Sequence, residues 1–213
     1  MTFPPEYGPY VKALVGVLAI VNPLGAVPIF LSLRGDRTSE ECNRIARTSA
    51  FSVAVILVAA SLAGEAILGF FGIGLPAFET GGGLLILLMA INMLHARPSH
   101  ARQSPEEADE ATGKDSIAVV PLAIPLMAGP GAISLVIINA HHTARWSDRL
   151  ILSAEIIVVA FAVWSALRLA SPIGEKLGIT GLNVATRVMG LLLAAIGIQL
   201  LASGLAKLLP GLA

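Results

Sequence analysis

Long apolar stretches separated by short polar connections run along almost the whole chain. A helix needs about 20 apolar residues to cross a bilayer, because each residue adds about 1.5 Å and the hydrocarbon core is about 30 Å thick. Six stretches reach or approach this length: Tyr10–Leu33, Thr48–Phe71, Phe78–Leu94, Ile117–Asn139, Leu150–Ala170 and Val188–Leu209. The pattern therefore predicts an all-α integral membrane protein with six transmembrane helices.

One polar connection is longer than the others. Residues 96–116 carry many charged side chains, among them Arg102, Glu106 and Lys114, without any apolar period. This composition is typical of a solvated linker. We expect a single membrane domain over residues 1–213, with three spans in residues 1–95, a cytoplasmic linker in 96–116 and three spans in 117–213.

Composition and charge support this interpretation. Hydrophobic residues make up 55% of the chain and charged residues 13%, and the mean hydropathy is +0.81. A water-soluble domain of this length could not bury so much apolar surface. The formal net charge is zero, and no basic cluster indicates a nucleic-acid partner. We expect the lipid bilayer to be the main surroundings of the chain.

The distribution of Lys and Arg predicts the orientation. Ten of them lie at the loops after the first, third and fifth spans, and four lie at the other side. Cytoplasmic loops carry the excess of positive charge in membrane proteins. Both termini are therefore expected to face outward.

The two halves of the chain resemble each other. A shift of 107 residues superposes Gly83 on Gly190 and Pro23 on Pro130, together with several leucines. A unit of three helices crosses the membrane an odd number of times, so a second copy must enter from the opposite side. We therefore expect two inverted three-helix repeats, an arrangement that many secondary transporters share.

Proline and glycine interrupt the first and fourth spans. The first contains Asn22-Pro23-Leu24-Gly25 and Pro28, and the fourth contains Pro121, Pro125 and Gly129-Pro130-Gly131. Proline removes a backbone donor, and glycine makes a non-helical conformation inexpensive. Both spans are predicted to break near mid-membrane, where the start of each second half offers N–H groups and a partial positive charge to an anion or a zwitterion.

These interruptions supply the candidate substrate-binding residues. The set consists of the polar, proline and glycine positions at the two predicted half-helix starts: Asn22, Pro23, Gly25, Pro28, Gly129, Pro130, Gly131 and Ser134. The alternative is a pair of kinked helices packed for stability, since proline and glycine are common in membrane spans.

Several of these motifs resemble a known family. Asn22-Pro23-Leu24-Gly25, Gly64-Glu65, Gly129-Pro130-Gly131 and Arg187-Val188-Met189-Gly190 are similar to segments of the MarC family of bacterial integral membrane proteins. The resemblance covers nearly the whole chain. It implies six transmembrane helices, a bacterial inner membrane, and a place near the amino-acid exporters of the LysE type, some of whose relatives carry small neutral amino acids.

Three carboxylates lie in or near spans, where an ionisable group is costly and is a functional candidate by default. Glu65 lies late in the second span and is the candidate for proton coupling; Glu79 lies at the start of the third. Alternatively, both sit at the interface, hydrated or capping the third span. Glu155 lies in the fifth span, where snorkelling or pairing with Arg149 is expected.

Arg187 opens the sixth span at the predicted cytoplasmic side. It is either an interfacial anchor or a gating residue paired with Glu175.

The sequence argues against an enzyme. Intramembrane hydrolases need a nucleophile with its base, paired aspartates or a metal site, whereas every Asp here falls in a predicted loop and no His lies deep in a span. We expect no cofactor and no metal. We hypothesise a secondary transporter that exports or exchanges small neutral amino acids such as alanine or glycine by alternating access. The sequence is also compatible with a homo-oligomer. A channel for a small polar solute, or a membrane protein without transport activity, remains the alternative.

Overall fold

The computed structural model describes residues 8–34, 37–95, 127–141 and 146–212, and these residues form helices without any strand. The helices, in chain order, are α1 (Gly8–Val21), α2 (Pro23–Arg34), α3 (Ser39–Phe70), α4 (Leu75–Leu94), α6 (Pro130–His141), α7 (Trp146–Arg168), α8 (Ala170–Leu208) and a short 3-10 turn at Pro210–Leu212. The predicted linker at 96–116 and the first part of the predicted fourth span lie outside the described residues.

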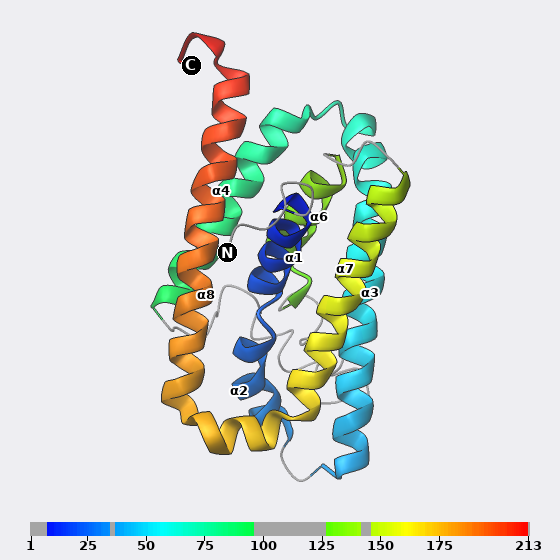
Figure 1. Ribbon diagram of the computed structural model, residues 1–213, viewed down its shortest axis with the longest axis vertical. Helices are drawn as coiled ribbons and strands as arrows, with labels where there is room; N and C mark the ends of the chain where they lie inside the picture. The colour runs from blue at the N-terminus through cyan, green and yellow to red at the C-terminus, as the bar shows by residue number, and fades with distance from the viewer. Residues whose placement is uncertain (1–7, 35–36, 96–126, 142–145, 213) are drawn as a thin grey trace.

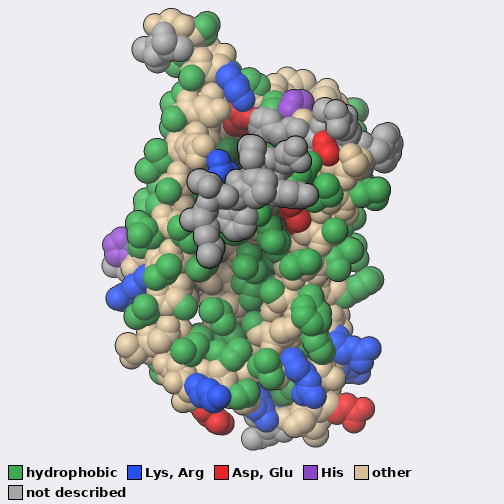
Figure 2. Space-filling view, viewed as in Figure 1, with side chains coloured by type: hydrophobic (Ala, Val, Ile, Leu, Met, Phe, Trp, Pro, Cys, Tyr) green, Lys and Arg blue, Asp and Glu red, His purple; other side chains and the backbone are tan. Residues whose placement is uncertain are grey.

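Length and composition suit a membrane. Within the described ranges, five helical stretches are long and apolar enough to cross one, with α1 and α2 together counting as one stretch, and α6 is a shorter apolar helix. Figure 2 shows hydrophobic side chains over the middle of one face, with most of the Lys, Arg, Asp and Glu side chains toward its two ends. The prediction of an all-helical chain with apolar spans is confirmed.

The helices form a central column between two flanking pairs (Figure 1). α1, α2 and α6 lie in the middle, the α4–α8 pair lies on one side and the α3–α7 pair on the other. In the most apolar stretch of 18 residues, half of the residues are buried in α1 and α2, against 22% in α8. The column therefore supplies much of the core, with fully buried Val17, Ile20 and Val136, while the pairs present leucines and phenylalanines outward.

The α4–α8 pair is held by backbone contact at glycines. Gly190, Gly197 and Gly204 recur every seven residues along α8 and all three are buried. A Cβ atom at Gly197 would lie 2.9 Å from the carbonyl oxygen of Gly83 and 2.9 Å from the amide nitrogen of Leu87. Small residues at such spacing let two membrane helices approach until their backbones touch.

The second span begins earlier than predicted. α3 starts at Ser39 rather than Thr48, because Thr38 caps it: the Thr38 hydroxyl accepts the Glu41 N–H at 3.3 Å, and the Glu41 carboxylate accepts the Thr38 N–H at 2.8 Å. This capping box satisfies two end donors at once. The polar first turns of α3 precede its apolar part, which is why the apolar pattern alone placed the start too late.

The helix of the sixth span also begins earlier than predicted, directly after Gly178 instead of at Val188. α8 as a whole extends from Ala170, and it changes direction at Gly178, whose φ of 60° and ψ of 179° are not helical. The short segment before Gly178 crosses the lower end of the molecule in Figure 1, and the long segment after it runs upward. Arg187 therefore lies within a continuous helix instead of opening one.

The glycine contact of α4 with α8 gives a stability prediction. Gly197→Ala forces the two backbones apart, so we expect the free energy of unfolding to fall by about 1–3 kcal/mol. Gly81→Ala on α4 is the matched control, because a Cβ atom there meets nothing within 4 Å. Thermal unfolding in detergent, followed by circular dichroism, compares the two. Equal transition temperatures for both variants would contradict the backbone contact.

Candidate substrate site at the helix interruptions

The interruption between α1 and α2 is a single residue. Asn22 separates Val21 from Pro23 and has a φ of 47°, in the left-handed region that asparagine tolerates better than most side chains. Its N–H donates to the Leu18 carbonyl at 3.0 Å, which completes the last turn of α1. Its side-chain carbonyl accepts the N–H of Gly25 at 3.2 Å, which caps the first turn of α2.

Gly25 is required by this cap. A Cβ atom at Gly25 would overlap the carboxamide nitrogen of Asn22. Pro23 has no N–H group, and the N–H of Gly25 is bound by Asn22. Few N–H groups therefore remain for the ligand predicted at this helix start.

The second candidate start, at α6, keeps its donors. The first intrahelical bond runs from the N–H of Ile133 to the carbonyl of Gly129, at 3.1 Å. The N–H groups of Gly131 and Ala132 precede that bond, since helix geometry leaves the first-turn donors without intrahelical acceptors. Both residues are buried, as is Gly129, whereas Pro130 is exposed. The start of α6 is therefore the better place for an anionic group.

The two starts lie close to each other. A Cβ atom at Gly131 would lie 3.0 Å from Cδ1 of Ile20, two residues before Asn22, and 2.6 Å from the sulfur of Met89 on α4. Figure 1 shows α2 running down from this level and α6 running up. Pro28 and Ser134 therefore lie further along in opposite directions, and the structure does not bring these two predicted residues together.

Ser134 has its own neighbour on the flanking pair. It is 5% exposed, and a Cβ atom at Gly82 of α4 would lie 3.1 Å from the Ser134 Cβ. This side chain faces the α4–α8 pair, one turn beyond the start of α6.

Glu65 lies at the end of α3, away from the interruptions. Its carboxylate pairs with the guanidinium of Arg149 at 3.1 Å and with the imidazole of His141. These side chains are between 33% and 45% exposed. The cluster joins the end of α3, the end of α6 and the start of α7, and it is partly exposed at the surface of the protein.

Glu79 is a buried ion pair and not a hydrated interfacial group. Only 1% of its side chain is exposed, and its carboxylate lies 2.8 Å and 3.0 Å from Nζ of Lys207 near the end of α8. The expectation of a hydrated carboxylate is wrong, because α8 extends far enough for Lys207 to cover Glu79 near the start of α4.

Comparison with known proteins identifies the family. The model of the MarC family, described as integral membrane proteins, matches residues 8–209. The chain belongs to the MarC family. Among its relatives, the UPF0056 membrane protein YhcE of Escherichia coli is 37% identical over 209 residues, which cover 97% of this chain and 96% of the relative.

Distant organisms carry similar chains. A UPF0056 membrane protein of Aquifex aeolicus is 35% identical over 98% of both chains, and one of Methanocaldococcus jannaschii is 33% identical over 92% of this chain and 95% of its own length. No solved structure matches. With its apolar helices, the MarC membership makes this an integral multi-pass membrane protein.

Glu155 in this MarC protein lies differently from the prediction. The expected partner, Arg149, is bound to Glu65, and Glu155 is only 8% exposed. Its Oε2 atom is buried and has no hydrogen-bond partner in the structure. Leu152, Ile156 and Val159 are also buried, so the helical period of α7 would have placed Glu155 on the inner face.

Arg187 is not paired with Glu175, its predicted partner, in the described residues. It is exposed on α8. The interfacial anchor is the interpretation that fits this position. The described residues also contain no group of three or more His, Cys, Asp or Glu side chains that could hold a metal ion.

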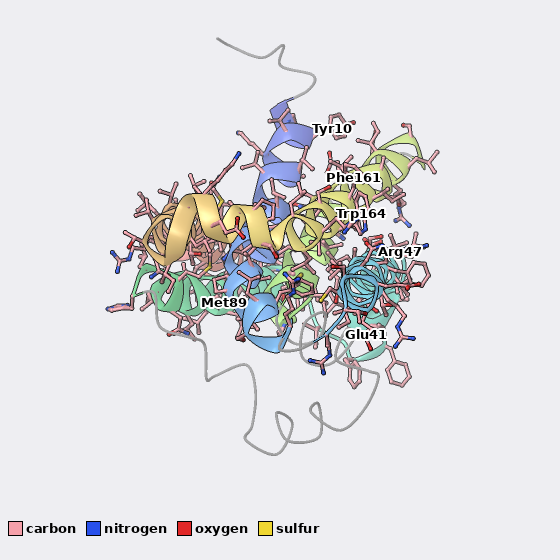
Figure 3. All side chains as sticks on the ribbon, turned by 90° about the horizontal axis from the view of Figure 1, so that it is seen from below. Tyr10, Glu41, Arg47, Met89, Phe161 and Trp164 are labelled. Atoms are coloured by element: carbon pink, nitrogen blue, oxygen red, sulfur yellow. The ribbon has the colours of Figure 1, made fainter. Side chains whose placement is uncertain are left out.

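A groove of about 1310 Å³ runs between α3 and α7, on the outer side of this pair. Figure 3 shows Phe161 and Trp164 of α7 beside Arg47 of α3. Phe51 and Phe161, which line it, are 70% and 62% exposed. The groove therefore opens toward the surroundings of the protein rather than toward the helix interruptions.

The capped interruption gives a prediction about Asn22. Asn22→Gly keeps the left-handed conformation and loses only the cap, so we expect a loss of less than about 1 kcal/mol in the free energy of unfolding. Asn22→Ala loses the cap and strains the backbone, with an expected loss of about 2–3 kcal/mol. Chemical unfolding in detergent measures both. If alanine proves no worse than glycine, the left-handed conformation is refuted.

Proposed function

We propose that this MarC protein is a secondary transporter of small neutral amino acids, such as alanine or glycine, that works by alternating access. The substrate site lies where α1 ends and α6 begins. The proposal rests on the position of the start of α6. This helix terminus has two first-turn N–H groups and is buried against Ile20 and Met89. Non-helical backbone at membrane depth is tolerated where it meets protein or a watery cavity.

Two inverted repeats are part of the proposal, and the helix bounds support them. Adding 107 to the bounds of α2, Pro23–Arg34, gives those of α6, Pro130–His141. The same shift carries the start of α3, Ser39, onto the start of α7, Trp146. In Figure 1 the members of each of these pairs run in opposite directions.

The contacts of two equivalent glycines support the same register. Gly83 and Gly190 are related by the shift of 107. A Cβ atom at Gly83 would touch three residues of α8, and a Cβ atom at Gly190 would touch three residues of α4. The residues are Gly197, Leu200 and Leu201 for Gly83, and Ala90, Met93 and Leu94 for Gly190. Each residue of the first set lies 107 positions after its counterpart in the second set. Such reciprocal contacts are what a two-fold axis between α4 and α8 produces.

A two-fold axis in the membrane plane suits a carrier. It relates one half of the protein to the other, so an arrangement open to one side has a near-equivalent open to the opposite side. The two arrangements then differ little in free energy, so a small difference in substrate affinity is enough to change their populations.

The chemistry of the site favours a small zwitterion. The carboxylate of an amino acid would accept the N–H groups of Gly131 and Ala132, and its ammonium would face the carbonyl end of α1, which carries a partial negative charge. Ile20, Ile86 and Met89 crowd Gly131, which limits the side chain of the substrate to a small one.

Orientation and compartment complete the proposal. The Lys and Arg distribution supports an orientation with the ends of α2 and α7 in the cytoplasm and both termini outward, and we propose the bacterial inner membrane as the location. We assign the protein no catalytic role.

Substitution of Gly131 tests the site. Gly131→Ala brings a methyl group against Met89 and Ile20 and so distorts the start of α6. We expect counterflow of alanine in proteoliposomes to fall by about tenfold or more. A tenfold fall corresponds to a loss of about 1.4 kcal/mol in the free energy of substrate binding. Gly81→Ala on α4 is again the control, because it adds the same methyl group in open space.

Three results would count against the proposal. Wild-type counterflow in a correctly inserted Gly131→Ala variant would reject the site. Downhill flux without counterflow in the unaltered protein would indicate a channel. No flux of any amino acid would reject the transport of this class.

A further inference from the structure

Glu155 is a buried carboxylate, and its Oε2 atom has no hydrogen-bond partner among the described residues. Its side chain is 8% exposed, and its Oε2 atom is out of contact with solvent and with any hydrogen-bond donor of the structure. Polar groups inside proteins are nearly always hydrogen-bonded, so an exception requires an explanation. Glu65 and Glu79, by contrast, both have basic partners.

The helix segments beside Glu155 in the described part of the chain are largely free of ionisable residues. α7 packs against α3, α1, α2, α6 and α8. The sequence contains no ionisable residue in 13–33, 48–64, 117–140, 150–154, 156–167 or 177–186. Outside those ranges, the other Asp, Glu, Lys, Arg, His and Tyr residues on these helices lie toward helix ends, except Arg187 within α8: Tyr10, Lys12, Arg34, Glu40, Glu41, Arg44, Arg47, Glu65, His141, Asp148, Arg149, Arg168, Glu175, Lys176, Arg187 and Lys207.

This isolation decides which form of the side chain the fold can hold. An ionised carboxylate in an apolar interior needs a cation or several donors to offset the loss of water. The neutral carboxylic acid needs much less. The structure therefore accommodates Glu155 as a carboxylic acid, and its ionisation requires water to reach it.

A partly exposed polar cluster lies a short distance from Glu155 along α7. Six residues separate Glu155 from Arg149, which corresponds to roughly 9 Å of helix. Arg149 belongs to the cluster with Glu65 and His141, whose side chains are partly exposed. Tyr10 donates to Asp148 at 3.0 Å, two turns before Glu155 on the same face of α7, so polar side chains of α1 and α7 meet at this end.

We propose that Glu155 is the proton-binding group that couples transport to a proton gradient. Its carboxylate takes one proton from water at the end of the molecule where Glu65 and His141 lie. The carboxylic acid releases the same proton to water at the other end after the access changes, so one proton crosses the membrane in each cycle. This inference rests on the proposed transport function and replaces Glu65, which is paired and exposed, in the coupling role.

Glu155→Gln is the decisive variant, because the amide has the shape and the neutral charge of the protonated acid. In proteoliposomes we expect it to keep alanine counterflow at the wild-type rate. We expect alanine accumulation driven by a pH gradient to fall to the level measured without a gradient. Glu175→Gln, which changes an exposed carboxylate, is the control and should leave both measurements unchanged.

A second measurement does not depend on the substrate. Infrared spectroscopy of the purified protein at neutral pH should detect the carbonyl band of a protonated carboxyl group. This band should be absent from Glu155→Gln and present in Glu175→Gln. It tests proton binding even in a protein that carries no amino acid.

The outcomes separate the two proposals. Absence of the band in the unaltered protein overturns the proton site, as does gradient-driven accumulation that survives in Glu155→Gln. Loss of counterflow in a folded Glu155→Gln variant also overturns it and assigns the carboxylate to the substrate ammonium. If the unaltered protein exchanges no amino acid, the transport function fails, and coupling fails with it; the band then decides only whether Glu155 binds a proton.

Discussion

Backbone N–H and carbonyl groups that enter hydrocarbon find no water, so an interrupted helix must satisfy them within the protein. At the α1–α2 interruption a single side chain meets this constraint: Asn22 ends one helix with its N–H and begins the next with its carboxamide. Its left-handed backbone makes the interruption one residue long. A helix interruption of this kind has to lie inside a bundle and away from lipid. This requirement explains why other helices surround α1 and α2.

The flanking pairs supply that enclosure in different ways. α4 and α8 touch backbone to backbone at glycines, which leaves no room for movement of side chains between them. α3 and α7 instead meet through larger side chains and leave a groove on their outer side. The central column thus lies between a closely packed pair and a looser one.

The spans could be predicted from the sequence because length and hydropathy depend on local composition. The interruption at Asn22 followed from the neighbouring proline and glycine. The start of α3 was also within reach, since Thr38 and Glu41 have the spacing of a capping box. The turn in α8 at Gly178 gave no such signal, because glycine within a helix is common in membrane proteins.

The pairing of charged groups could not be predicted in the same way. Lys207 lies 128 residues from Glu79, and Arg149 lies 84 residues from Glu65. Which carboxylate obtains a basic partner depends on how helix ends meet in space. Arg149 is closer in sequence to Glu155 than to Glu65, and only the position of α3 beside α7 decides between them.

Gly178 carries a mechanical consequence. Its φ and ψ belong to a region that side chains with a Cβ atom hardly enter. The chain there passes from the α3–α7 pair to the α4–α8 pair without a flexible loop, through one residue with two rotatable bonds. The turn from α3 to α4 also joins the two pairs, and there Gly72 has a φ of 66°. A rotation of one pair against the other would therefore change the backbone at Gly178 and Gly72, the two glycines with positive φ in the described residues.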